Sequence, residues 1–321
     1  MSNIVIKAST HQEWLDARRG GIGSSEVATL LGVNPWQTPY QLWLQKTSPF
    51  PKEQEESFLM KAGHYLEDAV SRFCADETGL QIIKNSSAEF VVVNREKPYL
   101  RVSPDRYGWK PGARKTKANK VIIECKTTQN SIEEDNIPPY WFVQVMYQLG
   151  VTELDEAVIA WLTQGRSFGY KWLTFDKDFY NDVIVETVER FWVDNVLGKK
   201  EPELTSIEDV LIKYPTHQEG LRIPATEEII DVYNELKETN EELKRLKGLK
   251  EEAEQKIKMS MLDGESLYIP ATAESPSRVL ATWKKSKDGL AFDVDKFQTE
   301  QPSLYNQYLI PKPGIRRFNL K

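Results

Sequence analysis

Two acidic residues and one lysine have the types and spacing needed for metal-assisted hydrolysis of a phosphodiester. Asp105 lies at the end of one predicted strand, and Glu124 and Lys126 lie in the next, within Val121-Ile122-Ile123-Glu124-Cys125-Lys126. Because side chains alternate along a strand, Glu124 and Lys126 share one face and Cys125 points the other way. If the strands pair, Asp105 comes beside them. Carboxylates bind Mg²⁺ or Mn²⁺, and the lysine would orient the attacking water or stabilise the developing charge.

A second interpretation is an exposed strand edge, where a Glu-x-Lys triplet simply faces solvent. The apolar run Val121-Ile122-Ile123 instead favours a buried strand, and charges that emerge from a buried strand need partners or a metal. The three histidines and two cysteines are scattered and do not form a zinc pattern. Any metal should therefore be bound by oxygen.

The composition is that of a globular protein. With 321 residues, 40% hydrophobic and 28% charged, the chain is long enough for one large domain with an appendage, or for two domains. No apolar run reaches the ~18 residues of a membrane span, and the first residues lack the layout of a signal peptide. We therefore expect a cytoplasmic protein with no membrane partner.

One basic stretch departs from the overall charge of −6. Residues 110–120 lie between the two predicted strands and carry five positive charges and no acid: Lys110, Arg114, Lys115, Lys117 and Lys120. This stretch is either a solvated hairpin tip or a finger that contacts a nucleic-acid backbone near the active site.

A glycine- and serine-rich turn near the N-terminus is a candidate anion site. Ser24 or Ser25 is the predicted N-cap of a helix that begins there, and free amides at such a turn bind anions. Arg18 and Arg19, just upstream, would add charge and bidentate donors. The alternative is an ordinary capped helix with surface arginines.

The elements that must position these residues form an α/β pattern over residues 1–200. We predict helices at 38–44, 55–78, from 139 to about 149, and 178–197, and strands at 81–84, 88–93, 99–102, 105–109, 121–126, 157–162 and 169–175. This order indicates one central mixed sheet flanked by helices. Glu67 either turns inward as a metal ligand or faces water. Gln144 and Gln148, four residues apart on one helical face, either hold a water or phosphate oxygen or are solvated.

The remaining chain changes character. Residues 201–225 are predicted to be a linker with a short helix at 206–213, and residues 226–262 a helical arm with heptad spacing at Ile229, Leu236, Leu243 and Ile257. Its seams are imperfect, so we expect a two-helix hairpin or an arm packed on a partner rather than a long dimeric coil. Residues 263–321 are predicted to form a small element with strands at 277–284 and 315–320 and helices at 293–299 and 302–308.

Five segments follow one another in a recognisable order between residues 10 and 200: Trp14 to Ser25, Gly63-x-x-x-Glu67, Pro104-Asp105, Glu124-Cys125-Lys126, and Pro139-Tyr140 to Gln148. Together they resemble the phage-type exonucleases of the YqaJ and lambda-exonuclease group, within the PD-(D/E)xK nuclease superfamily. The C-terminal layout, with Thr282-Trp283-Lys284 and Arg316-Arg317-Phe318, is also similar to phage members of the YqaJ type.

The resemblance implies a restriction-endonuclease-like core and 5′→3′ digestion of one strand of duplex DNA, with a 3′ overhang left for a single-strand annealing protein. It implies two Mg²⁺ or Mn²⁺ ions per site, held by Asp105, Glu124, the backbone carbonyl of Cys125 and Glu67. Lys126 and Gln144 would be catalytic. Ring-shaped homotrimers are also implied, in a bacterial or phage-infected cell.

The resemblance further implies that Arg18, Ser24 and Ser25 bind the terminal 5′-phosphate. Gln148 would be a DNA contact, but Gln144-Val145-Met146 departs from the Gln-x-Gln form expected in close relatives, which leaves the role of Gln148 open. Two other functions remain open: a structure-selective or site-specific endonuclease of the same superfamily, and a non-catalytic scaffold built on a nuclease-like domain.

Overall fold

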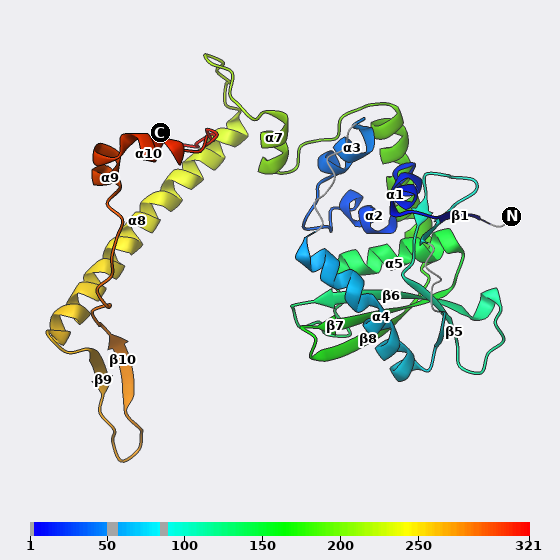
Figure 1. Ribbon diagram of the computed structural model, residues 1–321, viewed down its shortest axis with the longest axis horizontal. Coiled ribbons are helices and arrows are strands. Elements are labelled where there is room, and N and C mark those ends of the chain that lie inside the picture. The colour runs from blue at the N-terminus through cyan, green and yellow to red at the C-terminus, as the bar shows by residue number, and fades with distance from the viewer. Residues whose placement is uncertain (1–2, 50–56, 84–88) are drawn as a thin grey trace. The chain divides into compact units, whose positions relative to one another are not determined.

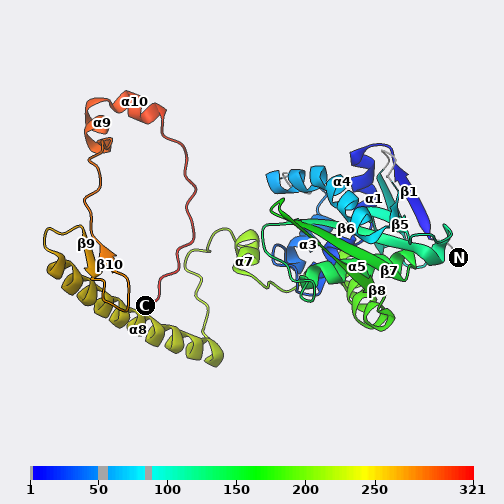
Figure 2. The same ribbon diagram turned by 90° about the horizontal axis from the view of Figure 1, so that it is seen from below.

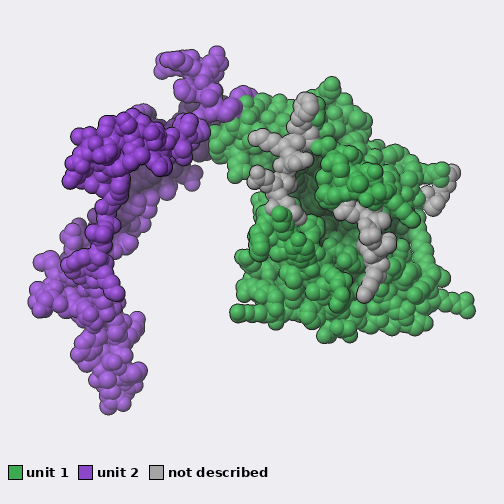
Figure 3. Space-filling view, in the orientation of Figure 1, with its two compact units in different colours: residues 1–213 green, residues 214–321 purple. Residues whose placement is uncertain are grey.

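The computed structural model describes residues 3–49, 57–83 and 89–321, and the chain divides into two compact units, 1–213 and 214–321 (Figure 3). A five-stranded sheet is at the centre of the first unit (Figure 1). Its strand order is β2–β5–β6–β7–β8, formed by Gln81–Ile82, Arg106–Trp109, Lys120–Thr128, Glu156–Thr163 and Ser167–Thr174. Only β6 and β7 are parallel, so the sheet is mixed, as predicted.

Helices cover both faces of this sheet. On one face Ile122 of β6 packs in a core with α5 (Pro139–Thr152), which contributes Val145 and Leu149. On the other face Val121 and Ile123 pack with Val70 and Cys74 of α4 (Phe58–Thr78). The alternation of β6 thus sends successive side chains into two separate cores. The predicted architecture of a mixed sheet flanked by helices is confirmed.

Local cap chemistry explains where several helices begin and end. The Ser57 hydroxyl accepts a hydrogen bond from the amide of Met60 at the start of α4, and Gly79 ends the helix with φ 70°. Thr38 caps α3 (Pro39–Thr47) in the same way. The cap of α2 (Ser24–Leu30) was predicted wrongly. Gly23 occupies that position and its amide donates to Glu26 Oε2 at 2.7 Å, so Ser24 already lies inside the helix.

Two N-terminal elements and a small sheet were not foreseen. β1 (Ile4–Ala8) pairs with β3 (Glu89–Val93), which pairs with β4 (Arg101–Val102), and α1 (His11–Arg19) packs beside them. The helix predicted at 178–197 is three consecutive segments, η2 (Phe179–Val185), α6 (Glu186–Arg190) and η3 (Phe191–Leu197), of which η2 and η3 have π-helical hydrogen bonding. Parts of three predicted elements, residues 55–56 of the helix, residue 84 of one strand and residue 88 of the next, lie outside the described residues.

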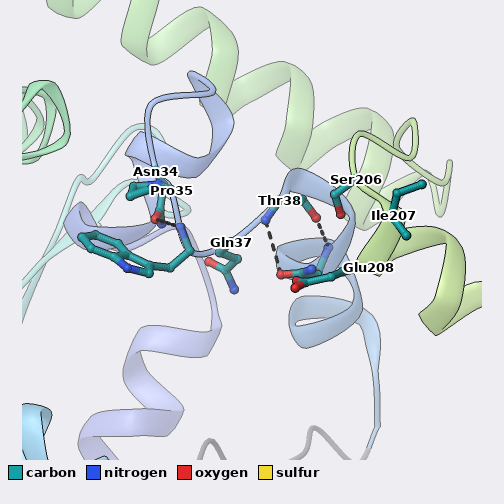
Figure 4. A pocket seen from close by; sticks show the side chains of 9 residues that line it. Asn34, Pro35, Gln37, Thr38, Ser206, Ile207 and Glu208 are labelled. Carbon is teal, nitrogen blue, oxygen red and sulfur yellow. Dashed lines mark hydrogen bonds between the residues drawn. The ribbon is translucent and has the colours of Figure 1, made fainter. Parts of the chain in front are cut away.

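Within the first unit, a buried carboxylate fixes the short helix α7 (Ile207–Lys213) to the N-terminus of α3. Asp209 accepts hydrogen bonds from the Thr38 hydroxyl at 2.6 Å and from the amides of Thr205 and Ser206. A surface hollow lies between residues 34–41 and 206–208 (Figure 4). It contains neither Asp105, Glu124 nor Lys126, so it is separate from the residues proposed for chemistry.

The second unit is built around one helix. α8 (Glu227–Met261) runs for 35 residues without a break, so of the two arrangements expected for this arm the two-helix hairpin is wrong (Figures 1 and 2). It is followed by a hairpin of β9 (Ser266–Ile269) and β10 (Arg278–Thr282), then by α9 (Val294–Glu300) and α10 (Pro302–Gln307). The strand predicted at 315–320 is also wrong, because these residues have no regular secondary structure and pair with none of the described strands. Across the described residues, no helix is long and apolar enough to cross a membrane.

Candidate active site

Asp105, Glu124 and Lys126 come together where β5 and β6 pair. Arg106 lies opposite Ile123, so Asp105, one residue earlier, reaches the level of Glu124. Asp105 Oδ2 accepts a hydrogen bond from the amide of Cys125 at 2.8 Å. Lys126 Nζ lies 2.7 Å from Glu124 Oε1, on the same face of the strand. The structure therefore assembles the acid, acid and lysine that the spacing predicted.

Two glutamines of α5 hold the same carboxylate from above the sheet. Gln144 donates to Glu124 Oε1 and accepts a hydrogen bond from Lys126 Nζ at 2.9 Å. Gln148 Nε2 donates to Glu124 Oε2 at 2.8 Å and to the Ser24 hydroxyl at 3.3 Å. Glu124 is 2% exposed and Gln148 is fully buried. Because both carboxylate oxygens accept from fixed donors, the orientation of Glu124 is set by α5 and Lys126.

The charges in this group shift one another's protonation. Burial raises the pKa of Asp105 well above its usual range, and the nearby carboxylates of Glu124 and Glu67 raise it further. Burial also raises the pKa of Glu67, more than Arg106 lowers it. For Lys126, burial favours the neutral form, but Glu124 and Asp105 outweigh it and raise the pKa. Lys126 is therefore a cation at neutral pH.

Arg106 is a site residue that the sequence analysis missed. Its guanidinium forms an ion pair with Glu67 of α4 and donates to the backbone carbonyl of Asp105 at 2.7 Å. The sequence signal that could have indicated Arg106 was the alternation of side chains along a strand. Arg106 follows Asp105 and therefore points to the opposite face of the strand, where α4 packs. Nothing in the sequence linked it to Glu67, 39 positions away.

The donor set fits a hard divalent cation. Asp105, Glu67 and Glu124 offer only oxygen, and their mutual repulsion, seen in the raised pKa of Asp105, is what a bound cation would relieve. In their present side-chain positions, no three His, Cys, Asp or Glu of the described residues form a ready cluster of ligands. Glu67 is turned to Arg106, and Glu124 to Lys126 and the glutamines. The Cys125 thiol, whose pKa burial raises well above its usual range, points away from this face.

The predicted phosphate-binding residues form a second group that adjoins the first. Arg18 lies 4.4 Å over the ring of Trp14, and its Nη2 donates to the Ser25 hydroxyl at 3.1 Å. Ser24, one residue earlier in α2, receives the hydrogen bond from Gln148. A chain of contacts therefore runs from Arg18 and α2 to Glu124.

The basic stretch is not brought to the carboxylates. Residues 110–119, which include η1 (Lys117–Asn119), connect β5 to β6 and enter β6 at Lys120, four residues before Glu124. Lys110 and Lys117 form ion pairs with Glu156 and Glu153. Arg114 and Lys115 are exposed, and Lys115 lies over the ring of Trp109 at 5.2 Å. A contact between this stretch and a nucleic acid remains a prediction.

Comparisons with known proteins show which family the chain belongs to. Residues 13–155 match the family described as the YqaJ-like viral recombinase domain. The chain is 30% identical over 325 residues to the uncharacterized protein YqaJ of Bacillus subtilis (strain 168), covering 97% of this chain and 94% of that protein. The chain belongs to the YqaJ-like viral recombinase family, as the order of its motifs predicted.

Solved structures are similar at lower identity. An alkaline exonuclease from Laribacter hongkongensis is 17% identical with a TM-score of 0.47, over 59% of this chain and 93% of that one. A phage-related exonuclease from Haemophilus somnus 129PT is 13% identical with a TM-score of 0.39, over 56% of this chain and 96% of that one.

Proposed function

We propose that this chain is a metal-dependent exonuclease that digests one strand of duplex DNA from 5′ to 3′ and leaves 3′ single-stranded overhangs. The observation that carries the proposal is one contact group, in which Lys126, Gln144 and Gln148 hold Glu124 beside Asp105. The description of the family as a viral recombinase domain agrees with a role in DNA recombination.

Lys126 is the residue best suited to act on the reacting phosphate. Its raised pKa keeps the ammonium charged, and its side chain is 19% exposed although Nζ contacts both Glu124 and Gln144. The ammonium would donate a hydrogen bond to the attacking water or to a phosphate oxygen. Gln144 fixes the position of Nζ through its own acceptor oxygen. Such fixed charges stabilise the transition state strongly in a site from which water is excluded.

Asp105, Glu124 and the backbone carbonyl of Cys125 would hold Mg²⁺ or Mn²⁺, two ions per site, with Glu67 as a further ligand. Bound ions of this kind supply a water of lowered pKa and neutralise charge on the scissile phosphate. Gln148 would serve this group by keeping Glu124 in place, rather than by contacting the ion.

Arg18, Ser24 and Ser25 would bind the terminal 5′-phosphate and so select a DNA end. The Arg18 guanidinium, which already donates to the Ser25 hydroxyl at 3.1 Å, has the planar donors that match a phosphate. Lys110, Arg114, Lys115 and Lys117 would contact the duplex backbone farther from the cut.

A single-strand annealing protein would take up the 3′ overhang, and a ring of three copies would enclose the product strand.

Digestion of a linear duplex tests the proposal. With Mg²⁺ and a 5′-phosphorylated, end-labelled substrate, the full chain should release nucleotides from 5′ ends and leave covalently closed circular DNA intact. Lys126→Ala should lose this activity, whereas Lys177→Ala, which removes an exposed lysine outside both groups of site residues, should keep it. Rapid cutting of the closed circle, release in EDTA, or full activity of Lys126→Ala would each contradict the proposal.

A further inference from the structure

An apolar stripe runs along α8 and is exposed within the second unit. Six aliphatic side chains at heptad positions are each between 37% and 55% exposed: Ile229, Val232, Leu236, Leu243, Leu246 and Ile257. Side chains spaced by three and four residues lie on one face of a helix, and a repeat of seven matches the seam of a coiled coil. A seam of this length in a helix of 35 residues needs a partner of the same length.

The interruptions of the stripe decide between the two possible self-pairings. In a parallel pair of identical helices, Lys250 would face Lys250 of the other copy in the seam, where two buried like charges are costly. In the antiparallel pair centred between Leu243 and Leu246, Lys250 instead faces Thr239. The apolar positions then face one another, Val232 against Ile257, Leu236 against Ala253, and Leu243 against Leu246.

The charges of α8 also favour the antiparallel arrangement. Residues 227–242 contain seven acids and one lysine, whereas residues 243–261 contain six lysines and arginines and three acids. Antiparallel pairing lays the acidic half of one helix along the basic half of the other. In the same register Glu235 lies across from Lys256, and the symmetry repeats this pair. Parallel pairing would place acid beside acid and base beside base.

We propose that α8 forms an antiparallel two-stranded coiled coil with α8 of a second copy of this chain. Three polar residues interrupt the apolar stripe: Thr239, Lys250 and Ser260. In this register Thr239 and Lys250 face each other, so two of the three interruptions share one layer. Ser260 faces Ile229 near the end of the helix. The pairing joins two chains through their second units and is independent of the nuclease function proposed for the first unit.

Cysteine cross-linking of the full chain tests the orientation. Thr239→Cys and Lys250→Cys are made as separate single variants, mixed, and oxidised with oxidised glutathione. A disulfide-linked dimer should form in the mixture and not in either variant alone, because position 239 faces position 250 only across the antiparallel pair. The unchanged chain, which keeps Cys74 and Cys125, measures background oxidation. A dimer from Lys250→Cys alone would mean parallel pairing and overturn the proposal.

Sedimentation equilibrium of the same full chain tests the stripe itself. Leu243→Glu puts a charge into the central layer on both chains and should raise the dissociation constant by about 100-fold. Ile230→Glu is the matched control, because Ile230 is 47% exposed but lies off the stripe, and it should change the constant by less than about threefold. Circular dichroism of each variant checks that α8 still forms. If Leu243→Glu leaves self-association unchanged, or if the mixture of Thr239→Cys and Lys250→Cys forms no disulfide-linked dimer, the proposal is overturned.

Discussion

Gln148→Met removes the amide that α5 presents to Glu124 while keeping the length and helix propensity of the side chain. Gln148 is fully buried, and it donates to Glu124 Oε2 at 2.8 Å and to the Ser24 hydroxyl at 3.3 Å. Its own Oε1 has no hydrogen-bond partner among the described residues. The substitution therefore removes two donations and one unsatisfied acceptor together.

The expected loss of stability follows from these three contacts. A hydrogen bond to a charged acceptor contributes about 1.5–3 kcal/mol, and the long contact to a neutral hydroxyl about 1 kcal/mol or less. Removing the unsatisfied buried oxygen returns about 1–3 kcal/mol. The midpoints of these ranges give a net cost of roughly 1 kcal/mol, which for a unit of this size lowers the melting temperature by about 2–4 °C. Activity should fall about 10- to 100-fold, as when the partner of a metal ligand is removed.

Gln148→Glu sharpens the test, because it places a second buried carboxylate against Glu124. Burial and the like charge raise the pKa of the new carboxyl in the folded chain, so its fit is best at low pH and is lost as pH rises through that pKa. Its melting temperature should therefore fall relative to the unaltered chain between pH 5 and pH 8, while the deficit of Gln148→Met stays constant. Thermal unfolding monitored by circular dichroism at both pH values measures this difference.

Gln12→Met is the control for Gln148→Met, since exposed Gln12 also donates to a carboxylate, Asp16 Oδ1, at 3.0 Å. A surface contact of this kind should contribute less than about 0.5 kcal/mol. If Gln148→Met unfolds at the temperature of the unaltered chain and digests DNA equally fast, Gln148 does not hold Glu124 and the account of the site is wrong.

Three further predictions concern single residues of the two groups. Lys126→Ala should lower the rate of nucleotide release by about 10²–10³-fold, the effect of removing one fixed donor from a developing charge, in single-turnover assays where Lys177→Ala is unchanged. Asp105→Asn should lose activity, yet in EDTA at pH 7–8 it should resist unfolding by urea better than the unaltered chain. The raised pKa of Asp105 means that ionisation of this carboxyl disfavours the fold. The gain in stability should therefore vanish as the pH falls toward 3.8, the ordinary pKa of an aspartate. Arg18→Ala should reduce the preference for 5′-phosphate over 5′-hydroxyl ends by about tenfold or more, with competing substrates as the measurement; an unchanged preference would remove Arg18 from the phosphate site.

The predictions that succeeded rest on local physics. Strand alternation placed Glu124 and Lys126 on one face, and helical spacing placed Gln144 and Gln148 on another, because side-chain direction within an element depends only on backbone geometry. α4 ends at Gly79 as expected, since a left-handed C-cap favours glycine. Two predictions that depend on neighbouring elements were wrong. Gly23, and not Ser24 or Ser25, is the N-cap of α2, and residues 315–320 form no strand because none of the described strands pairs with them.

By itself the sequence determined the chemistry at hand: two carboxylates, a lysine and two amides, each on an element that could be predicted, and a family whose motifs appear in order. Only the tertiary structure decided which of these groups meet. It joined Gln148 to Ser24 across 124 positions, turned Glu67 to Arg106, and paired Lys110 and Lys117 with acids away from the site. The physical reason is that ion pairs and buried hydrogen bonds depend on distances between elements, which the packing of α4 and α5 on the two faces of the sheet sets and which no local pattern encodes.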